Sequence, residues 1–132
     1  DRSVSRGLGD VYKRQVYAVE LKSSGSLIGL LGFHWADFKA DFTPCVEIGW
    51  RLVPEAWGHG YATEGARACL EHGFARLGLD RVYSFTACVN LPSQAVMQRA
   101  GMRKTAEFNH PKVAPDSVLY PHVLYVREAS HA

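Results

Sequence analysis

Apolar and polar residues alternate along the first half of the chain in the pattern of β-strands. Two β-rich runs, 16–21 and 27–35, flank a Ser/Gly cluster and predict a β-hairpin. In a third run, 45–53, the apolar positions 46, 48, 50 and 52 face one way, whereas Glu47, Gly49 and Arg51 face the other. These three runs predict an antiparallel meander.

After the third run the period becomes helical. Apolar residues at 62, 66, 70, 74 and 77 predict a helix that Gly78 ends, and 81–89 is the next strand. Asn90 and Pro92 open a short helix that Gly101 closes, and strands at 102–108 and 118–126 follow. We therefore predict one domain over 16–128 with a C-terminal tail at 129–132.

Composition narrows the function classes. The 132 residues are 47% hydrophobic and 21% charged, which suits one globular domain. The net charge of +2 lies entirely in residues 1–15, because the other 117 residues hold 11 basic and 11 acidic side chains. A neutral domain argues against nucleic acid or an anionic membrane surface as the main partner.

Residues 1–15 (DRSVSRGLGDVYKRQ) read differently from the rest. They show neither strand alternation nor helical apolar spacing. The string resembles a translated sequencing-adapter artefact, so we expect a non-native segment; an ordinary disordered tail is the alternative. A continuous native reading frame through this segment at the source locus would contradict the first interpretation.

Cysteine usage and hydropathy bear on compartment and metal binding. Cys45, Cys69 and Cys88 are widely spaced, with no CxxC pair and no His at metal-ligand spacing. We therefore expect a reduced, cytoplasmic protein without a metal site. The longest apolar stretch, 27–36, is about half of what a bilayer span needs, and we expect no signal peptide because nothing near residue 1 forms an apolar h-region.

A glycine-rich turn, WGHGYA at 57–62, joins the third strand to the first helix. Glycines there let backbone N–H groups converge at a helix N-terminus, which suits a phosphate or pyrophosphate. The alternative is only a tight strand-to-helix connection. No P-loop string occurs, and the dinucleotide fingerprint GxGxxG fails where Thr63 replaces its third glycine.

Two segments resemble the motifs of the GCN5-related N-acetyltransferases (GNAT). RLVPEAWGHGYATE at 51–64 is similar to the family's Gln/Arg-x-x-Gly-x-Gly/Ala loop, with Trp57 in the Gln/Arg place as in the branch resembling the RimJ/RimL ribosomal-protein acetyltransferases. NLPSQAVMQRAGM at 90–102 resembles a second family motif. The resemblance covers about residues 16–127. In the family a first strand and two helices should precede Val16, and we expect them to be missing here, so that the domain is N-terminally truncated.

The resemblance implies an α/β (α+β) acyltransferase fold, with a mixed, mainly antiparallel sheet splayed at its middle and helices on its faces. It also implies acetyl-CoA as co-substrate. By correspondence with the motifs, backbone groups at the strand end bind the pantetheine arm, the loop binds the pyrophosphate, and the second motif adds one contact. The implied residues are Trp50, Arg51 and Leu52; Gly58, His59, Gly60, Tyr61, Ala62 and Thr63; and Asn90.

Catalytic groups are less directly indicated. Many relatives place a Tyr where this chain has Met97, which cannot donate a proton to the leaving thiolate. Ser93 matches a Ser proposed for that role in the RimL-like branch, with a helix-capping Ser as the alternative. Glu47 is our candidate base for the amine proton, and the alternative is a structural carboxylate paired with Arg51.

The expected activity is acetyl transfer from acetyl-CoA to a primary amine by direct attack in a ternary complex. The acceptor is a protein N-terminal α-amine or a small molecule, and a homodimer is left open. The alternative from another class is a CoA-binding fragment or pseudoenzyme without catalysis; a dinucleotide-binding domain is a more remote one.

Overall fold

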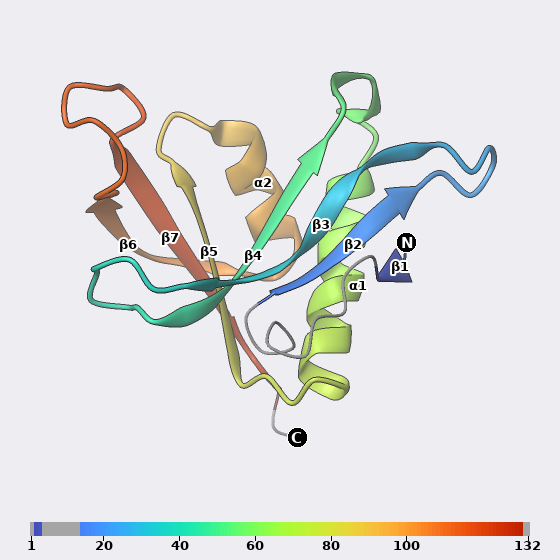
Figure 1. Ribbon diagram of the computed structural model, residues 1–132, viewed down its shortest axis with the longest axis horizontal. Coiled ribbons are helices and arrows are strands. Elements are labelled where there is room, and N and C mark those ends of the chain that lie inside the picture. The colour runs from blue at the N-terminus through green and yellow to red at the C-terminus, as the bar shows by residue number, and fades with distance from the viewer. Residues whose placement is uncertain (1, 4–13, 131–132) are drawn as a thin grey trace.

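The computed structural model describes residues 2–3 and 14–130, which form one twisted sheet with two α-helices (Figure 1). Within this part of the chain the sheet has seven strands in the order β1-β2-β3-β4-β5-β7-β6, and only the β4–β5 pair is parallel. The predicted α/β fold with a mixed, mainly antiparallel sheet is confirmed. The strands are β1 Arg2–Ser3, β2 Arg14–Glu20, β3 Leu27–Ala36, β4 Cys45–Leu52, β5 Arg81–Ala87, β6 Arg103–Asn109 and β7 Pro121–Glu128.

The predicted hairpin and meander are present as β2, β3 and β4. Each strand pairs with the next in antiparallel register, with Phe33 opposite Ile48 and His34 opposite Glu47. β2 begins at Arg14, two residues before the expected start, and Arg2–Ser3 pairs with it. The remainder of the N-terminal segment, residues 1 and 4–13, lies outside the described residues, so the interpretation of that segment stays a prediction.

Both α-helices pack on the same side of the sheet, which we call the helix face. Helix α1, Tyr61–Ala75, and helix α2, Leu91–Arg99, contribute to one buried cluster with all the central strands. The predicted alternation of β4 is confirmed, since Ile48 is fully buried in this cluster. The cluster contains Leu31, Phe33, Ile48, Ala66, Cys69, Leu70, Val82, Met97, Ala100, Met102, Val123 and Tyr125.

Two sequence-based expectations about packing are wrong. Helix α1 ends at Ala75 with Arg76 as its C-cap, so Gly78, with φ 71°, lies in the following turn instead of capping the helix. Trp35, whose large aromatic ring most simply predicts a core position, keeps 40% of its surface exposed near the end of β3.

β4 and β5 separate soon after they meet. Their only register pair is Glu47 opposite Tyr83, and the Ser84 hydroxyl donates a 2.8 Å hydrogen bond to the carbonyl of Ile48 just beyond it. From there the strands diverge, and α2 lies behind the opening between them (Figure 1). This opening is the splay that the family resemblance implied, and we call Glu47–Ile48 with Tyr83–Ser84 the vertex.

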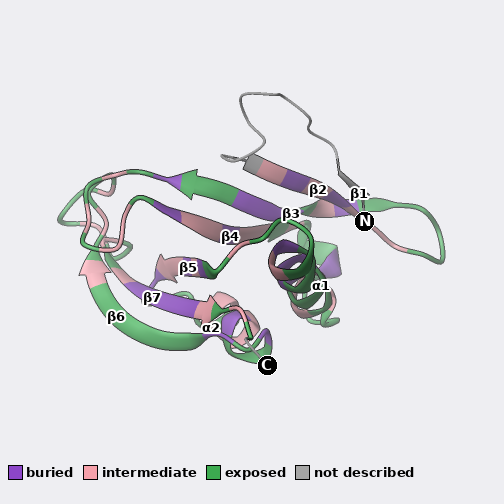
Figure 2. Ribbon diagram, turned by 90° about the horizontal axis from the view of Figure 1, so that it is seen from below, coloured by how far each residue is buried: buried purple, intermediate pink, exposed green. Residues whose placement is uncertain are grey.

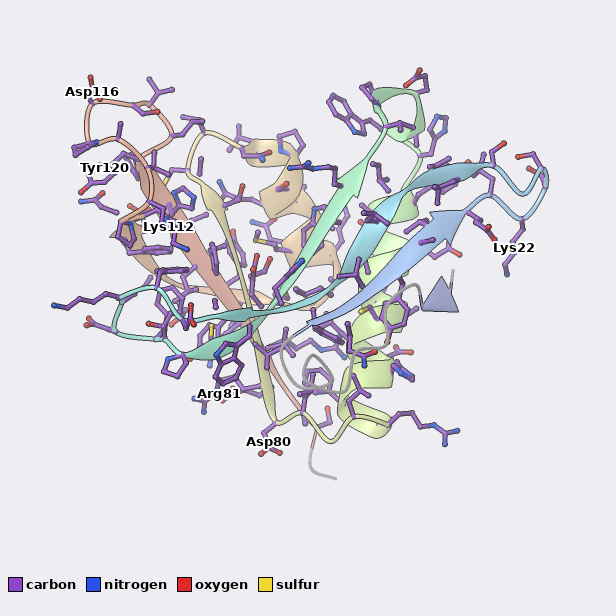
Figure 3. The ribbon with its side chains drawn as sticks, viewed as in Figure 1. Lys22, Asp80, Arg81, Lys112, Asp116 and Tyr120 are labelled. Atoms are coloured by element: carbon purple, nitrogen blue, oxygen red, sulfur yellow. The ribbon has the colours of Figure 1, made fainter. Side chains whose placement is uncertain are left out.

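The opposite side of the sheet, the open face, carries an aromatic cluster between the β3–β4 loop and the β6–β7 hairpin. Burial, followed by His122 and Lys112, lowers the pKa of His110 within it. Figure 3 shows Lys112 and Asp116 at one end of the molecule and Lys22 at the other, and Figure 2 shows β6 exposed along most of its length. The cluster comprises Phe38, Phe42, Phe85, Phe108, His110 and His122.

Candidate functional site

A cleft of about 900 Å³ opens where β4 leaves β5. Its walls are the end of β4, the glycine turn with the start of α1, and the first turns of α2. Nine of the ten residues expected to bind the cofactor line it, and Ser93 does so too. The lining residues are Trp50, Arg51, Leu52, Ala56, Trp57, Gly58, Gly60, Tyr61, Ala62, Thr63, Asn90, Pro92, Ser93, Ala95, Val96 and Arg99.

The glycine turn leaves the start of α1 uncapped by any side chain. Gly58 and Gly60 have φ angles of 78° and 79°, the left-handed conformation that L side chains rarely adopt. Gly60 is the N-cap and has no side chain to accept a hydrogen bond, so the first-turn N–H groups, whose residues line the cleft, lack a side-chain cap. Such N–H groups, with the helix dipole behind them, favour a bound anion.

The end of β4 presents backbone groups to the same cleft. The Ile48 carbonyl faces β5, and because strand groups alternate sides, the backbone of Trp50 also faces the opening. The Leu52 carbonyl is already used, since it accepts a 2.9 Å bond from Nε1 of Trp57. Trp50 therefore offers an N–H and a carbonyl to an extended ligand, in the manner of an added strand.

Two residues differ from the expected cofactor set. His59 does not line the cleft; its ring stacks on Tyr61 with centroids 5.2 Å apart. Sequence reasoning missed Arg99, which ends α2 and lines both the cleft and an adjoining hollow that also includes Arg67. A basic residue in the last turn of a helix is first interpreted as a favourable charge at the C-terminal end of the helix dipole. Only the three-dimensional arrangement therefore shows that Arg99 lines the cleft.

Ser93 and Asn90 open α2 at the edge of the cleft. The Asn90 side chain caps the helix by accepting a 3.2 Å hydrogen bond from the Ser93 backbone N–H, so its capping role is real. The capping bond uses only the backbone of Ser93, whose side chain lines the cleft. Met97, in contrast, is 1% exposed and belongs to the core. Ser93 is thus the hydroxyl placed beside the cleft in this helix.

Glu47 lies at the vertex on the open face, outside the cleft lining. Burial raises the pKa of its carboxyl group to about 7. Among the described residues no ion pair joins it to Arg51, so the paired-carboxylate alternative finds no support. A carboxyl group that titrates near neutrality is suited to accept a proton from an amine.

Three other side chains with ionisable groups are buried: Tyr125, Cys45 and Cys69. Tyr125 is 3% exposed on the helix face and accepts a hydrogen bond from Gln98, so it does not reach the open face. Burial raises the pKa of Cys45 to about 11 and of Cys69 to about 12, which argues against nucleophilic thiolates. Over residues 2–3 and 14–130 no cluster of three metal-ligating side chains occurs, and no helix there has the length and apolarity to span a membrane.

Comparison with known proteins identifies the family. Residues 5–103 match the family model described as "Acetyltransferase (GNAT) domain". The chain belongs to the GNAT acetyltransferase family. A Bordetella pertussis structure assigned to the GNAT-family acetyltransferases shares the fold, with 30% identity, a TM-score of 0.73, and coverage of 89% of this chain and 68% of that one.

Two curated relatives give the range of similarity. The N-acetyltransferase YnaD of Bacillus subtilis is 34% identical over 105 residues, which are 80% of this chain and 58% of YnaD. The FsC-acetyl coenzyme A-N(2)-transacetylase of Aspergillus fumigatus is 41% identical over 71 residues, which are 54% of this chain and 29% of that protein. The chain thus spans less than two thirds of the length of these relatives.

Proposed function

We propose that this GNAT domain transfers an acetyl group from acetyl-CoA to a primary amine by direct attack in a ternary complex. The observation that carries the proposal is the cleft itself, in which uncapped helix N–H groups and unpaired strand-end groups face one space. A thioester with a pyrophosphate arm needs both kinds of contact. The acetyl coenzyme A named for the Aspergillus fumigatus relative supports the choice of donor.

The cleft residues divide into groups that would hold the donor. The N–H groups of Tyr61, Ala62 and Thr63 bind the pyrophosphate, and the Trp50 backbone pairs with the pantetheine arm. Arg67 and Arg99 border the outer end of the cleft, where they attract further phosphate charge. The donor supplies an acetyl group activated as a thioester.

The proposed chemistry is addition followed by elimination. The neutral amine nitrogen forms a bond to the acetyl carbon, and the C–S bond then breaks. Backbone N–H groups at the splayed strand end around Leu52 stabilise the developing oxyanion, Glu47 accepts the proton from the attacking nitrogen directly or through water, and Ser93 donates a proton to the thiolate. The products are an N-acetyl amide and free coenzyme A thiol.

The acceptor is a protein N-terminal α-amine or a small-molecule amine. Trp57 and Ser93, at the motif positions described above, support a place in the RimJ/RimL-like branch. We also propose action in the cytoplasm without nucleic acid or membrane partners, with homodimer formation left open. The competing proposal is a domain that binds coenzyme A without catalysing transfer, favoured by the buried Met97 where many relatives have a Tyr.

Amine-dependent release of coenzyme A thiol separates these two functions. With acetyl-CoA and a panel of primary amines, we expect thiol release that requires the amine. Ser93→Ala should lower the turnover number at least tenfold, the usual contribution of a positioned acid, while calorimetric affinity for coenzyme A changes less than threefold. Ser130→Ala, at an exposed site near the C-terminus, is the control. Coenzyme A binding without turnover for any amine would favour the non-catalytic domain.

A further inference from the structure

Gly49 is a glycine in mid-strand that the fold itself does not require. It lies on the open face of β4, one residue past the vertex, between Glu47 and Arg51. Its φ angle is not in the left-handed range. Glycine in a strand interior costs stability relative to alanine, so its presence there calls for a physical reason.

The other glycines of the meander have such a reason in the packing. A Cβ atom at Gly29 would overlap the carbonyl oxygen of Arg51, and one at Gly32 would overlap that of Gln15. At Gly49 the nearest atoms to an added Cβ are Oε2 of Glu47 at 3.6 Å and Cε1 of His34 at 3.9 Å. Both distances are ordinary van der Waals contacts, so alanine fits without displacing any neighbour.

The space over Gly49 adjoins the proposed chemistry from both sides. On one side is the next residue of β4, Trp50, whose backbone faces the cleft. Toward the vertex lies the carboxyl group of Glu47. The ionisable groups that a Cβ atom at this position would meet are Glu47 on β4 and His34 on β3. Further ionisable groups on β4 and the strand beside it are Cys45 and Arg51, which alternate with Gly49 along β4, and Tyr83 of β5, opposite Glu47.

We propose that Gly49 is a specificity-determining residue whose missing side chain leaves the space through which the acceptor amine reaches Glu47. The inference rests on the proposed transferase function and deepens it. A methyl group at position 49 would occupy the volume within 3.6 Å of the carboxylate oxygen that an ammonium group must enter. The space best suits an amine on an unbranched carbon, because Glu47 and His34 already lie within 3.6 Å and 3.9 Å of a single carbon atom placed there.

The test compares Gly49→Ala with the wild-type chain in two assays. Calorimetry gives coenzyme A affinity, and thiol release gives kcat/KM for n-butylamine and for sec-butylamine. We expect unchanged affinity within twofold, an equal or higher melting temperature, and a loss of at least tenfold in kcat/KM for both amines. The wild type should prefer n-butylamine. Ser130→Thr, which adds one methyl group at an exposed site, is the matched control and should match the wild type.

Each result bears on a separate claim. Full turnover by Gly49→Ala overturns the proposal and leaves the transferase function intact, whereas lost coenzyme A affinity or a lower melting temperature shows a cofactor or folding role instead. If the wild type acetylates neither amine, the proposed transferase function is contradicted for these two acceptors. Binding of the amine in the space over Gly49 is then measured by NMR. A Gly49 amide shift on adding n-butylamine to the coenzyme A complex, smaller in Gly49→Ala, supports it; no shift overturns it.

Discussion

At the residue scale, Glu47 has a half-buried carboxyl group and lies at the vertex, beside the point where the cleft opens between β4 and β5. The burial that raises its pKa to about 7 suits the base proposed for acetyl transfer near neutral pH, and it destabilises the folded state when the carboxyl group is ionised. The proposed role and the cost in stability therefore have one physical cause, and both can be measured in a single variant.

The rate of acetyl transfer should follow the ionisation of Glu47. Because the base acts in its ionised form, kcat/KM should rise with pH through about 7, and Glu47→Gln should lose this limb together with at least tenfold in rate at pH 8. Glu107→Gln, an exposed carboxylate paired with Lys104, is the control and should retain the limb. An unchanged pH profile in Glu47→Gln would remove Glu47 from the reaction.

Stability should show the opposite trend with pH. The folded pKa lies above the unfolded value of 4.5, so the native state binds the proton more tightly and the free energy of unfolding falls as pH rises from about 4.5 to 7. Glu47→Gln should therefore be more stable than the wild type at pH 8, by roughly 2 to 3 kcal/mol. Denaturant unfolding at pH 4 and pH 8 checks this, and an equal or negative difference at pH 8 would show that the carboxylate is favourably solvated.

At the scale of elements, periodicity and turn chemistry predicted both helices and six of the seven described strands to within about three residues, but not how they meet. Strand β1 was missed, and the last strand, expected at 118–126, lies at Pro121–Glu128. The alternation along 45–53 placed Glu47 and Ile48 on opposite faces, and this is what the structure shows. It could not place the vertex, because the contact between β4 and β5 depends on residues 36 positions apart. The uncapped helix start was foreseen from local glycines, whereas Arg99 and Gly49 gain meaning only from neighbours distant in sequence.

The Ser84 hydroxyl should fix where β4 and β5 separate. It is 2% exposed and supplies the donor for the Ile48 carbonyl, which Ser84→Ala leaves without that partner. We expect a loss of about 1 to 3 kcal/mol in the free energy of unfolding and weaker coenzyme A binding, because the cleft wall can shift. Ser24→Ala, in the exposed β2–β3 turn, should change stability by less than about 0.5 kcal/mol. Equal effects in the two variants would contradict a role for the vertex bond.

At the scale of the whole molecule, the chain consists of two halves that meet at the vertex and in one core. One half is β1–β4 with α1, and the other is β5–β7 with α2. The cleft takes one wall from the first half and the other from the second, since the glycine turn and Trp50 face Asn90, Ser93 and Arg99 across it. A ligand that spans the cleft must therefore join the halves as well as occupy a site.

Coenzyme A should consequently protect both halves against hydrogen exchange. At about 100 times its dissociation constant it adds about 2.7 kcal/mol to the free energy of unfolding, and this should slow exchange at the start of α1 and at the start of α2 together. Amides beside Arg81, which pairs with Glu128 at the end of β7 away from the β6–β7 loop, should be slowed only by the global increase in stability. Protection confined to the α1 half would mean that the ligand leaves Ser93 and Arg99 untouched, and the assignment of Ser93 as the proton donor would then fail on binding evidence alone.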